Sequence, residues 1–435
     1  MRLKDILDID YFILLPVIAL MVLGVLFIYS SGITSGGNLV STEYMRQIIW
    51  ASIGLAVALA LSLVNYRRFY DAALYLYLFI LIPLLYTCVF GRVVHGTRWL
   101  RIGIFGIQSS EFAKIATIIF LARYLADTRI GKNSFARFIT ACFIVFVPMG
   151  IVLVQPDLGT SLVFIPILLT MTFVAGVSIR YVIFSVSCIL LTGGLTILPF
   201  WQSYILRRSL PVIAVVTNLR LMIIVILALG IITSIALFGY LKYRKRYFFW
   251  MMYVSAIVIF SLGASYVARG VLKSYQIMRL IVFLNPNIDP RGAGWNIIQS
   301  ITAIGSGGLS GQGFLQGTQS HYRFLPEQST DFIFSIFSEE MGFIGGIAVF
   351  ALFLIIWLRF LRIIKTAADP FAAYVCAGLV GVFSFHFIIN VGMTMGIMPI
   401  TGIPLLFMSY GGSSLISAML GIGLALSIHV RRYSH

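Results

Sequence analysis

The chain has 435 residues, of which 60% are hydrophobic and only 10% are charged. Soluble domains carry about 25% charged residues, because surface-to-volume scaling leaves them a large polar exterior. The composition therefore excludes a soluble enzyme, a disordered chain, a collagen and a disulfide scaffold. Long unbroken apolar runs favour helices over barrel strands, which would alternate over about ten residues. We expect an all-α, polytopic integral membrane protein.

Apolar runs long enough to cross about 30 Å of hydrocarbon predict twelve transmembrane helices. In chain order they lie near 11–31, 47–64, 72–91, 110–127, 138–154, 158–177, 181–200, 221–240, 247–267, 332–358, 371–393 and 402–430. The first run is too long for a cleavable signal peptide, and no small-residue cleavage site follows it. The longest connection, 268–331, keeps Ile, Trp, Phe and Leu throughout, which predicts an ordered and functional loop on the outer side.

The net charge of +17 has a different meaning in a membrane protein than in a soluble one. In a soluble chain it would suggest nucleic acid, whereas cytoplasmic loops of membrane proteins carry excess Lys and Arg. With the N-terminus in the cytoplasm, more than half of the 31 basic residues fall on that side. This arrangement predicts that both termini are cytoplasmic and that nucleic acid is not a partner.

A second basic set falls on the predicted outer side, where the positive-inside rule would place few such residues. It comprises Arg92, Arg98, Arg101, Arg207, Arg208, Arg269, Lys273, Arg279, Arg291 and Arg323. An anionic group handled at the outer face would explain this set, and solvated loop charge is the alternative. Four cysteines, far apart and within apolar runs, have no metal or disulfide spacing and are interpreted as small core residues.

The most informative acid is Asp331, in the segment FLPEQSTDFIFSIFSEE at 324–340. Pro326 ends the preceding segment, and Ser329 or Thr330 is a plausible N-cap, which would place Asp331 in the first turn of a helix entering the membrane. Capping alone would explain an isolated Asp at a helix start. Nearby acids favour a function instead: they are Glu327, Glu339 and Glu340. Glu339 would lie about 12 Å deeper at 1.5 Å per residue and needs a partner, for which Lys114 is a candidate.

Two further motifs place ionisable groups beside apolar runs. Glu111 and Lys114, in GIQSSEFAKI at 106–115, are three residues apart and can pair on one helix face, with Ser109 or Ser110 as the cap. A purely structural ion pair is the alternative. Asp157 lies in the break QPDLGTS between two apolar runs, where capping of a turn is the alternative to function. The glycine-rich segment GSGGLSGQG at 305–313 opens no strand–helix unit, so flexible turns and close backbone approach explain it better than a nucleotide.

An ordered series of motifs across most of the chain resembles the SEDS family (shape, elongation, division and sporulation), which comprises FtsW, RodA and SpoVE proteins. The motifs are HGTRWLRIG (95–103), QSSEFAKI (108–115), QPDLGTSLV (155–163), the segment 275–320 beginning YQIMRLIVFLNPNIDP, FLPEQSTDFIFSIFSEEMG (324–342), FHFIINVGMTMGIMPITGIPLL (385–406) and SYGGSSL (409–415).

The resemblance implies a peptidoglycan glycosyltransferase that polymerises lipid II at the outer face of the bacterial plasma membrane. It further implies work with a class B penicillin-binding protein and other elongation-complex membrane proteins. The family's essential aspartate falls on Asp331, which we expect to be the general base. Residues expected to contact substrate are Arg98, Trp99, Glu111, Lys114, Asp157, Arg279, Glu327, Thr330, Ser409, Tyr410 and Ser413. Cations among them would stabilise the pyrophosphate, and the resemblance also allows a divalent Mg or Mn ion as a cofactor.

The chain departs from the family pattern in three places. Ser329 stands where the family usually has His, so the motif lacks the histidine that would assist Asp331. Leu406 stands where PLPF is common. The family typically has ten spans, so the pair at 221–267, joined by KYRKR, is interpreted as a two-helix insertion in one domain of residues 1–435. The alternative functions are a lipid II flippase or transporter, a division-specific polymerase, and a scaffold for the cross-linking partner.

Overall fold

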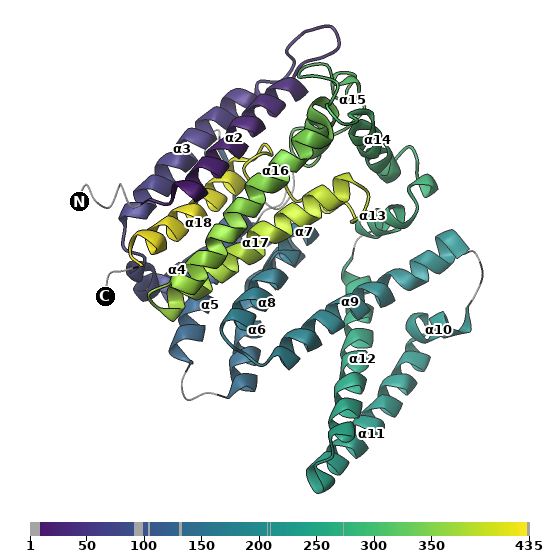
Figure 1. Cartoon of the computed structure of the whole chain (residues 1–435). Coiled ribbons are helices and arrows are strands. Elements are labelled where there is room, and N and C mark those ends of the chain that lie inside the picture. The colour runs from purple at the N-terminus through teal and green to yellow at the C-terminus, as the bar shows by residue number, and fades with distance from the viewer. Residues whose placement is uncertain are drawn as a thin grey trace. The chain divides into compact units, whose positions relative to one another are not determined.

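The computed structural model describes residues 9–90, 99–102, 105–129, 133–206, 208, 210–272 and 274–432. These residues are mainly helical, which confirms the all-α prediction (Figure 1). The long helices are α2 (Tyr11–Ser31), α3 (Glu43–Leu63), α4 (Arg67–Phe90), α5 (Ser109–Asp127), α6 (Ser134–Val154), α9 (Ile179–Trp201), α11 (Leu219–Tyr243), α12 (Arg246–Val271), α16 (Ile333–Thr366), α17 (Pro370–Thr394) and α18 (Gly412–Val430). The shorter ones are α7 (Leu158–Leu162), α8 (Phe164–Val174), α10 (Pro211–Thr217), α13 (Ser274–Leu284), α14 (Ala293–Ser306) and α15 (Thr318–His321).

The chain divides into two compact units. Unit 1 comprises Met1–Val177 and Asn296–His435, and unit 2 comprises Ser178–Trp295. The boundaries of unit 2 lie well outside the pair at 221–267. That this pair is an insertion into a single domain stays a prediction.

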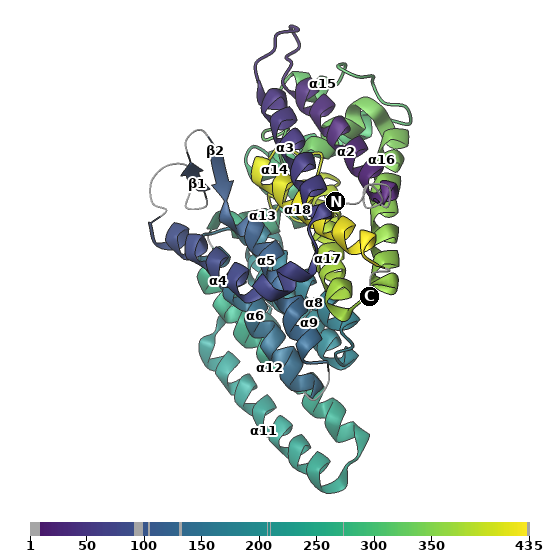
Figure 2. The ribbon, with the colours of Figure 1, turned by 90° about the vertical axis from the view of Figure 1, so that its left-hand side faces the viewer.

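The core of unit 1 is formed by α17 and α18. In their most apolar windows 72% and 78% of the residues are buried, against 22% in α3 and α4. Helix α18 packs on α3, and α17 packs on α8 and α16, beside which it runs in Figure 1. Helix α5 packs on α4, α6, α17 and α18, and the hairpin of β1 (Trp99–Ile102) and β2 (Phe105–Gln108) leads directly into it (Figure 2).

Among the described residues, ten helices are long and apolar enough to cross a membrane, rather than the expected twelve. The two predicted spans that fall short are 110–127 and 158–177. The first forms α5, whose 19 residues include Glu111, Lys114 and Arg123 and are too charged for a simple apolar span. The second is broken at Val163 into α7 and α8.

The two ends of unit 1 are defined by polar contacts between helix ends. At one end, here called the Asp10 end, Arg359 donates to Asp10 at 2.6 Å and the Tyr66 hydroxyl donates to Asp369 at 2.6 Å. At the other, called the Asp331 end, Gln47 donates to the Ser409 carbonyl at 3.1 Å. Both α5 and the broken pair α7–α8 run between these ends. Gln108 binds Asp157 at the Asp331 end, and Arg137 binds the carbonyls of Leu125 and Ala175 at the Asp10 end.

Unit 2 is built on α9, α11 and α12, with α12 packed against both of the others. Its small core contains Val216, Met222 and Leu262. The basic segment KYRKR forms the tight turn between α11 and α12, and Arg244 adopts left-handed backbone there, with φ of 52°. The predicted spans 181–200, 221–240 and 247–267 are therefore present as helices in the expected order.

Helix α16 is interrupted at Gly342, whose backbone is not helical, with φ of 64° and ψ of −162°. The break frees backbone groups, and the glycine-rich segment 307–313 satisfies them. Gln312 and Gly313 donate to the carbonyls of Glu339 and Glu340, both at 3.0 Å. In return, Phe343 and Ile344 donate to the carbonyls of Gly308 and Leu309 at 2.9 and 3.1 Å. Close backbone approach is the reason for Gly307 and Gly311, where an added Cβ would lie 2.1 and 2.0 Å from the carbonyl oxygens of Ser338 and Glu340.

Candidate active site at the Asp331 end

The predicted base, Asp331, lies in a turn that precedes α16. Backbone N–H groups of Thr330, Asp331 and Phe332 all converge on the Glu327 carbonyl, at 3.3, 3.1 and 3.4 Å. Glu327 adopts left-handed backbone, with φ of 50°, and its side chain is exposed. The Thr330 hydroxyl donates to the Glu327 carbonyl and also lies 3.3 Å from its carboxylate. The predicted residues Glu327, Thr330 and Asp331 therefore share one turn.

The predicted caps of α16 and α5 are wrong. Helix α16 begins at Ile333 with Phe332 in the N-cap position, so Asp331 lies before the helix instead of in its first turn. Helix α5 begins at Ser109 after Gln108, and neither Ser109 nor Ser110 makes a capping bond. Their hydroxyls are buried without a hydrogen-bond partner among the described residues. The β-hairpin directly before α5 decides where that helix starts, which helix-start preferences alone do not predict.

Asn390 on α17 and the loop between α17 and α18 both contact the Asp331 turn. The amide group of Asn390 donates to the Asp331 carbonyl at 2.9 Å and to the Ile403 carbonyl at 2.8 Å. The Tyr410 N–H donates to the Ser329 carbonyl at 2.8 Å. The Ser409 hydroxyl accepts the Leu405 N–H at 2.9 Å. Ser409 therefore has a structural contact within the loop, and the backbone of Tyr410 reaches the Asp331 turn.

The pair predicted at the start of α5 is present and buried. Lys114 Nζ lies 2.8 Å from Glu111 Oε2, and the two residues are 2% and 3% exposed. A third residue joins them, because Lys114 Nζ lies 3.1 Å from His386 Nε2 on α17. The other ring nitrogen of His386 lies 3.0 Å from the Pro404 carbonyl. The pair is thus connected to the same loop that contacts the Asp331 turn.

Asp157 and Ser413 are tied to the end of the β-hairpin. Asp157 caps α7, as the alternative for this residue predicted, by accepting the Thr160 N–H at 3.2 Å. Its second oxygen accepts from the Gln108 side chain at 2.9 Å. The Ser413 hydroxyl accepts the Gln108 N–H at 3.1 Å and donates to the Gly106 carbonyl at 3.3 Å. These residues fix β2 and the start of α5 against α7 and α18.

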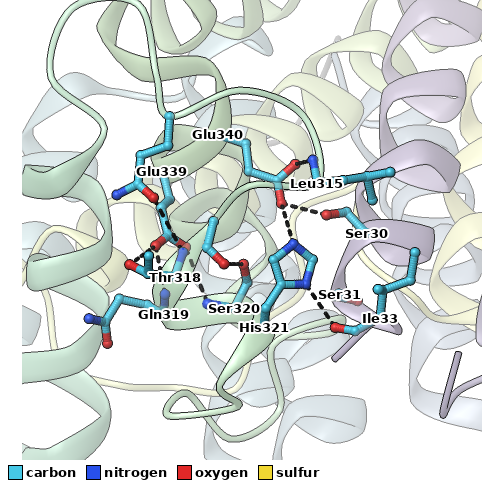
Figure 3. A network of polar contacts seen from close by, with 12 residues as sticks. Ser30, Ser31, Ile33, Leu315, Thr318, Gln319, Ser320, His321, Glu339 and Glu340 are labelled. Atoms are coloured by element: carbon cyan, nitrogen blue, oxygen red, sulfur yellow. Dashed lines mark hydrogen bonds and ion pairs between the residues drawn. The ribbon is translucent and has the colours of Figure 1, made fainter. Parts of the chain in front are cut away.

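The deeper acids on α16 do not pair with Lys114, so that prediction is wrong. Figure 3 shows Glu339 turned toward α15, where it accepts the N–H groups of Gln319 at 2.7 Å and Ser320 at 3.2 Å. Glu340 accepts the Leu315 N–H at 3.0 Å and the Ser30 hydroxyl, and its carboxylate lies 3.9 Å from the His321 ring. Backbone donors of 315–320 reach these buried carboxylates because the segment folds back into the broken helix.

Three predicted residues remain, and each is described by itself. Arg98 lies outside the described residues. Trp99 opens β1, opposite Gln108 in the hairpin register. Arg279 lies on α13 in unit 2, with its guanidinium 5.8 Å from the centre of the Tyr275 ring.

The site also contains residues that the sequence motifs did not single out, chiefly His386, Asn390, Gln47 and Gln108. A usable signal existed for the first two. His386 and Asn390 are polar residues four apart in an otherwise apolar run, and polar groups in such runs are usually functional. The role of Gln47 and Gln108 depends on contacts with segments far along the chain, which no local pattern indicates.

A divalent cation would need protein ligands, and the described residues offer few. Within the described ranges, no group of three or more His, Cys, Asp or Glu side chains could hold a metal ion. The Asp331 turn offers only the carboxylates of Glu327 and Asp331. No chemical step is therefore assigned to a protein-bound metal.

Comparison with known proteins places the chain in a family. The family FTSW_RODA_SPOVE, cell cycle proteins, matches residues 11–210 and 201–434. The chain is 48% identical over 433 residues to peptidoglycan glycosyltransferase RodA of Treponema pallidum, covering 99% of this chain and all of that one. It is 32% identical to stage V sporulation protein E of Bacillus subtilis and to peptidoglycan glycosyltransferase MrdB of Escherichia coli K12, each match covering 98% of this chain and 97% or 95% of the relative.

Two solved structures share the fold. A chain of a peptidoglycan synthase complex that coordinates polymerization and crosslinking has a TM-score of 0.65 at 23% identity, covering 98% of this chain and 99% of that one. The rod shape determining protein RodA of Thermus thermophilus has a TM-score of 0.60 at 22% identity, covering 98% of both chains. At such identities these likenesses concern the fold alone. With the family match over nearly its whole length, the chain belongs to the FtsW/RodA/SpoVE family, the SEDS family, and is a multi-pass membrane protein.

Proposed function

We propose that the protein is a peptidoglycan glycosyltransferase that polymerises lipid II into glycan strands during cell elongation, with Asp331 as its general base. The relative at 48% identity bears that enzyme name, as does the Escherichia coli relative at 32%. The observation that carries the proposal is the position of Asp331. It lies outside the first turn of α16, in a turn whose backbone groups are held by Glu327 and Asn390, so capping of α16 does not account for it.

The reaction needs one base and compensation for a leaving anion. The acceptor sugar hydroxyl attacks the anomeric carbon of the donor sugar, and the bond from that carbon to the pyrophosphate oxygen breaks. The hydroxyl proton passes to the Asp331 carboxylate and then to solvent, and the lipid-linked pyrophosphate departs as an anion. Because pyrophosphate leaves without protonation, no second carboxylic acid is required, in contrast to glycoside hydrolysis. A positioned base of this kind contributes about 10²–10⁴ in rate.

Cations near the outer face would stabilise the departing pyrophosphate. Arg98 and Arg279 are the proposed donors, together with Trp99 against a sugar face. Lys114 is not among these donors, because its ammonium is buried and already contacts Glu111 and His386. A divalent cation bridging the substrate pyrophosphate and a carboxylate stays a prediction, as does contact of Asp157, Ser409, Tyr410 and Ser413 with substrate.

The distribution of charge in unit 1 supports an outward-facing site and cytoplasmic termini. Basic residues gather near the Asp10 end: they are Arg67, Arg68, Arg123, Arg129, Arg137, Arg359, Arg362, Lys365, Arg431 and Arg432. At the Asp331 end the described basic residues of unit 1 are Arg46, Arg101, Arg323 and the buried Lys114. The positive-inside rule then assigns the Asp10 end to the cytoplasm of a bacterial plasma membrane. A class B penicillin-binding protein is the proposed partner, because the structural relative works in a complex that also crosslinks.

The deciding experiment supplies labelled lipid II to the purified protein in detergent, with and without the cross-linking partner. We expect glycan strands from the wild type, and at least a 100-fold lower rate from Asp331→Asn. Glu43→Gln is the matched control, because Glu43 also lies at the Asp331 end but at the start of α3. A parallel arm with chelator measures the cation requirement.

Two outcomes would overturn the proposal. Polymer from Asp331→Asn at the wild-type rate would remove Asp331 as the base. A wild type that makes no polymer even with its partner, but moves labelled lipid II across liposomes, would establish the flippase instead. A wild type that neither makes polymer nor moves lipid II would favour the scaffold function.

A further inference from the structure

We propose that His386 and Asn390, one helical turn apart on α17, are positioning residues for Asp331, and that they connect the buried Glu111–Lys114 pair to the base. The inference rests on the proposed function, since it assumes that Asp331 is the base. Neither residue is placed to touch substrate: they are 1% and 0% exposed, respectively. Their effect is on the backbone that carries the reacting carboxylate.

Asn390 holds the peptide of Asp331 in place. Asp331 lies before the regular helix. The Ser335 N–H, four residues further on, donates to the Phe332 carbonyl and not to the Asp331 carbonyl. Asn390 Nδ2 supplies a donor at 2.9 Å, while its second hydrogen reaches the Ile403 carbonyl at 2.8 Å. Both neighbours are acceptors only, so the amide has one possible orientation. Fixing the carbonyl of Asp331 also restricts the direction in which its side chain leaves the backbone.

His386 binds Pro404, the residue that follows Ile403 in the loop between α17 and α18. The Pro404 carbonyl can only accept, so Nδ1 of His386 carries the hydrogen and donates at 3.0 Å. Nε2 is then the acceptor, and it lies 3.1 Å from the ammonium of Lys114. Lys114 is oriented in turn by Glu111 at 2.8 Å. The buried ion pair therefore selects the histidine tautomer that binds Pro404.

The two contacts act on adjacent residues. Ile403 and Pro404 are consecutive, and His386 and Asn390 lie on one face of α17 because they are four residues apart. Polar contacts therefore run from Glu111 through Lys114 and His386 to Pro404, and from Ile403 through Asn390 to Asp331. This geometry assigns Lys114 a positioning role. It also gives a reason for two buried charges on α5, since a buried ion pair is often no more stabilising than apolar residues of similar volume.

The test compares Asn390→Ala with Thr394→Val in the lipid II polymerisation assay. Thr394 is also fully buried on α17, but the partner of its hydroxyl among the described residues is the Val391 carbonyl of its own helix, at 2.8 Å. Displacing a reacting group by about 1 Å costs roughly 100-fold. We expect Asn390→Ala to lower kcat about 10- to 100-fold, with the KM for lipid II changed less than about threefold. Thr394→Val should keep the wild-type kcat.

A pH–rate profile separates positioning from simple loss of folded enzyme. Partial unfolding lowers the amplitude of the profile and leaves its acid midpoint in place. A displaced base changes its surroundings, so we expect the acid midpoint of Asn390→Ala to move. Asn390→Asp is a harsher change, because it directs carboxylate oxygens at two carbonyls. It should be less active than Asn390→Ala.

For His386 the conservative variant is Gln, whose amide offers one donor for Pro404 and one acceptor for Lys114. We expect His386→Gln to retain more activity than His386→Ala. The losses of activity caused by His386→Ala and Asn390→Ala should be clearly non-additive in the double variant, since the two side chains bind the adjacent residues Pro404 and Ile403.

The proposal fails if folded Asn390→Ala has the wild-type kcat and acid midpoint, or if the double variant is additive. These results would leave Asp331 as the base, provided that Asp331→Asn is inactive. A wild type that makes no polymer would instead overturn the proposed function itself.

Discussion

The contact between the glycine-rich segment and the break in α16 leads to a sharp prediction for Gly342→Ala. Gly342 has φ of 64° and ψ of −162°, a backbone region that only glycine enters without strain. A Cβ added there would meet the Gly311 nitrogen at 2.3 Å and the Leu309 carbonyl oxygen at 2.7 Å. Both are backbone atoms and cannot rotate away, so the segment 308–313 must separate from the helix.

The magnitude follows from what the separation removes. Backbone strain accounts for about 1–3 kcal/mol. The four backbone hydrogen bonds between 308–313 and the broken helix contribute about 0.5–1.5 kcal/mol each. We therefore expect the segment to lose at least about 3 kcal/mol of local stability. Since 1.4 kcal/mol is a factor of about ten, its amides should exchange at least about 100-fold faster.

Hydrogen–deuterium exchange in detergent measures this directly, with Gly346→Ala as the matched control. Gly346 lies four residues further along α16, and a Cβ added there would have Phe334 Cζ as its nearest neighbour, at 4.0 Å. Alanine there should be neutral or stabilise the helix by up to about 1 kcal/mol. Equal exchange of 308–313 in both variants would refute the reasoning, because it would mean that the segment does not depend on the break.

Two further predictions concern stability. Glu339→Gln removes the charge that accepts three donors from 318–320, so the free energy of unfolding should fall by about 1.5–3 kcal/mol, measured as a lower Tm than in Glu43→Gln; an unchanged Tm would contradict the contact. Tyr66→Phe removes the hydroxyl that donates to Asp369 at 2.6 Å. Burial, reinforced by that bond, raises the pKa of Tyr66 to about 12, so the folded state holds this proton more tightly than the unfolded chain. Its contribution should be complete below about pH 10 and be lost toward pH 12, and the Tm difference between wild type and Tyr66→Phe should narrow over that window. A difference that is constant with pH would exclude the contact.

Much of the architecture was predictable because it depends on local composition. An apolar run of about 20 residues has to be a helix in lipid, since only a helix satisfies its own backbone. Ten of the predicted spans are accordingly present as long apolar helices. Asp331, Glu111 and Lys114 were also recognisable locally, as ionisable groups beside or within such runs.

The partners of those groups were not predictable in the same way. Glu339 faces Gln319 and Ser320 instead of Lys114, because the break at Gly342 admits a returning segment. The N-cap position of α16 is Phe332 and not the predicted Ser329 or Thr330, since Asn390 and the Glu327 carbonyl hold the Asp331 turn outside the helix. Spacing along one helix predicted the Glu111–Lys114 contact, but it could not supply His386, 272 residues further on.

The sequence by itself determined that this is a helical membrane protein of the SEDS family, and where its apolar helices and its costly acids lie. Only the tertiary structure decided which donors satisfy each buried carboxylate, which two of the predicted spans are not simple apolar helices, and how the base is held. The physical reason is that apolar length is a property of one segment, whereas a buried charge is stabilised by whatever donors the fold brings to it. Gln47 and Ser409, in contact across 362 positions of the chain, are an example.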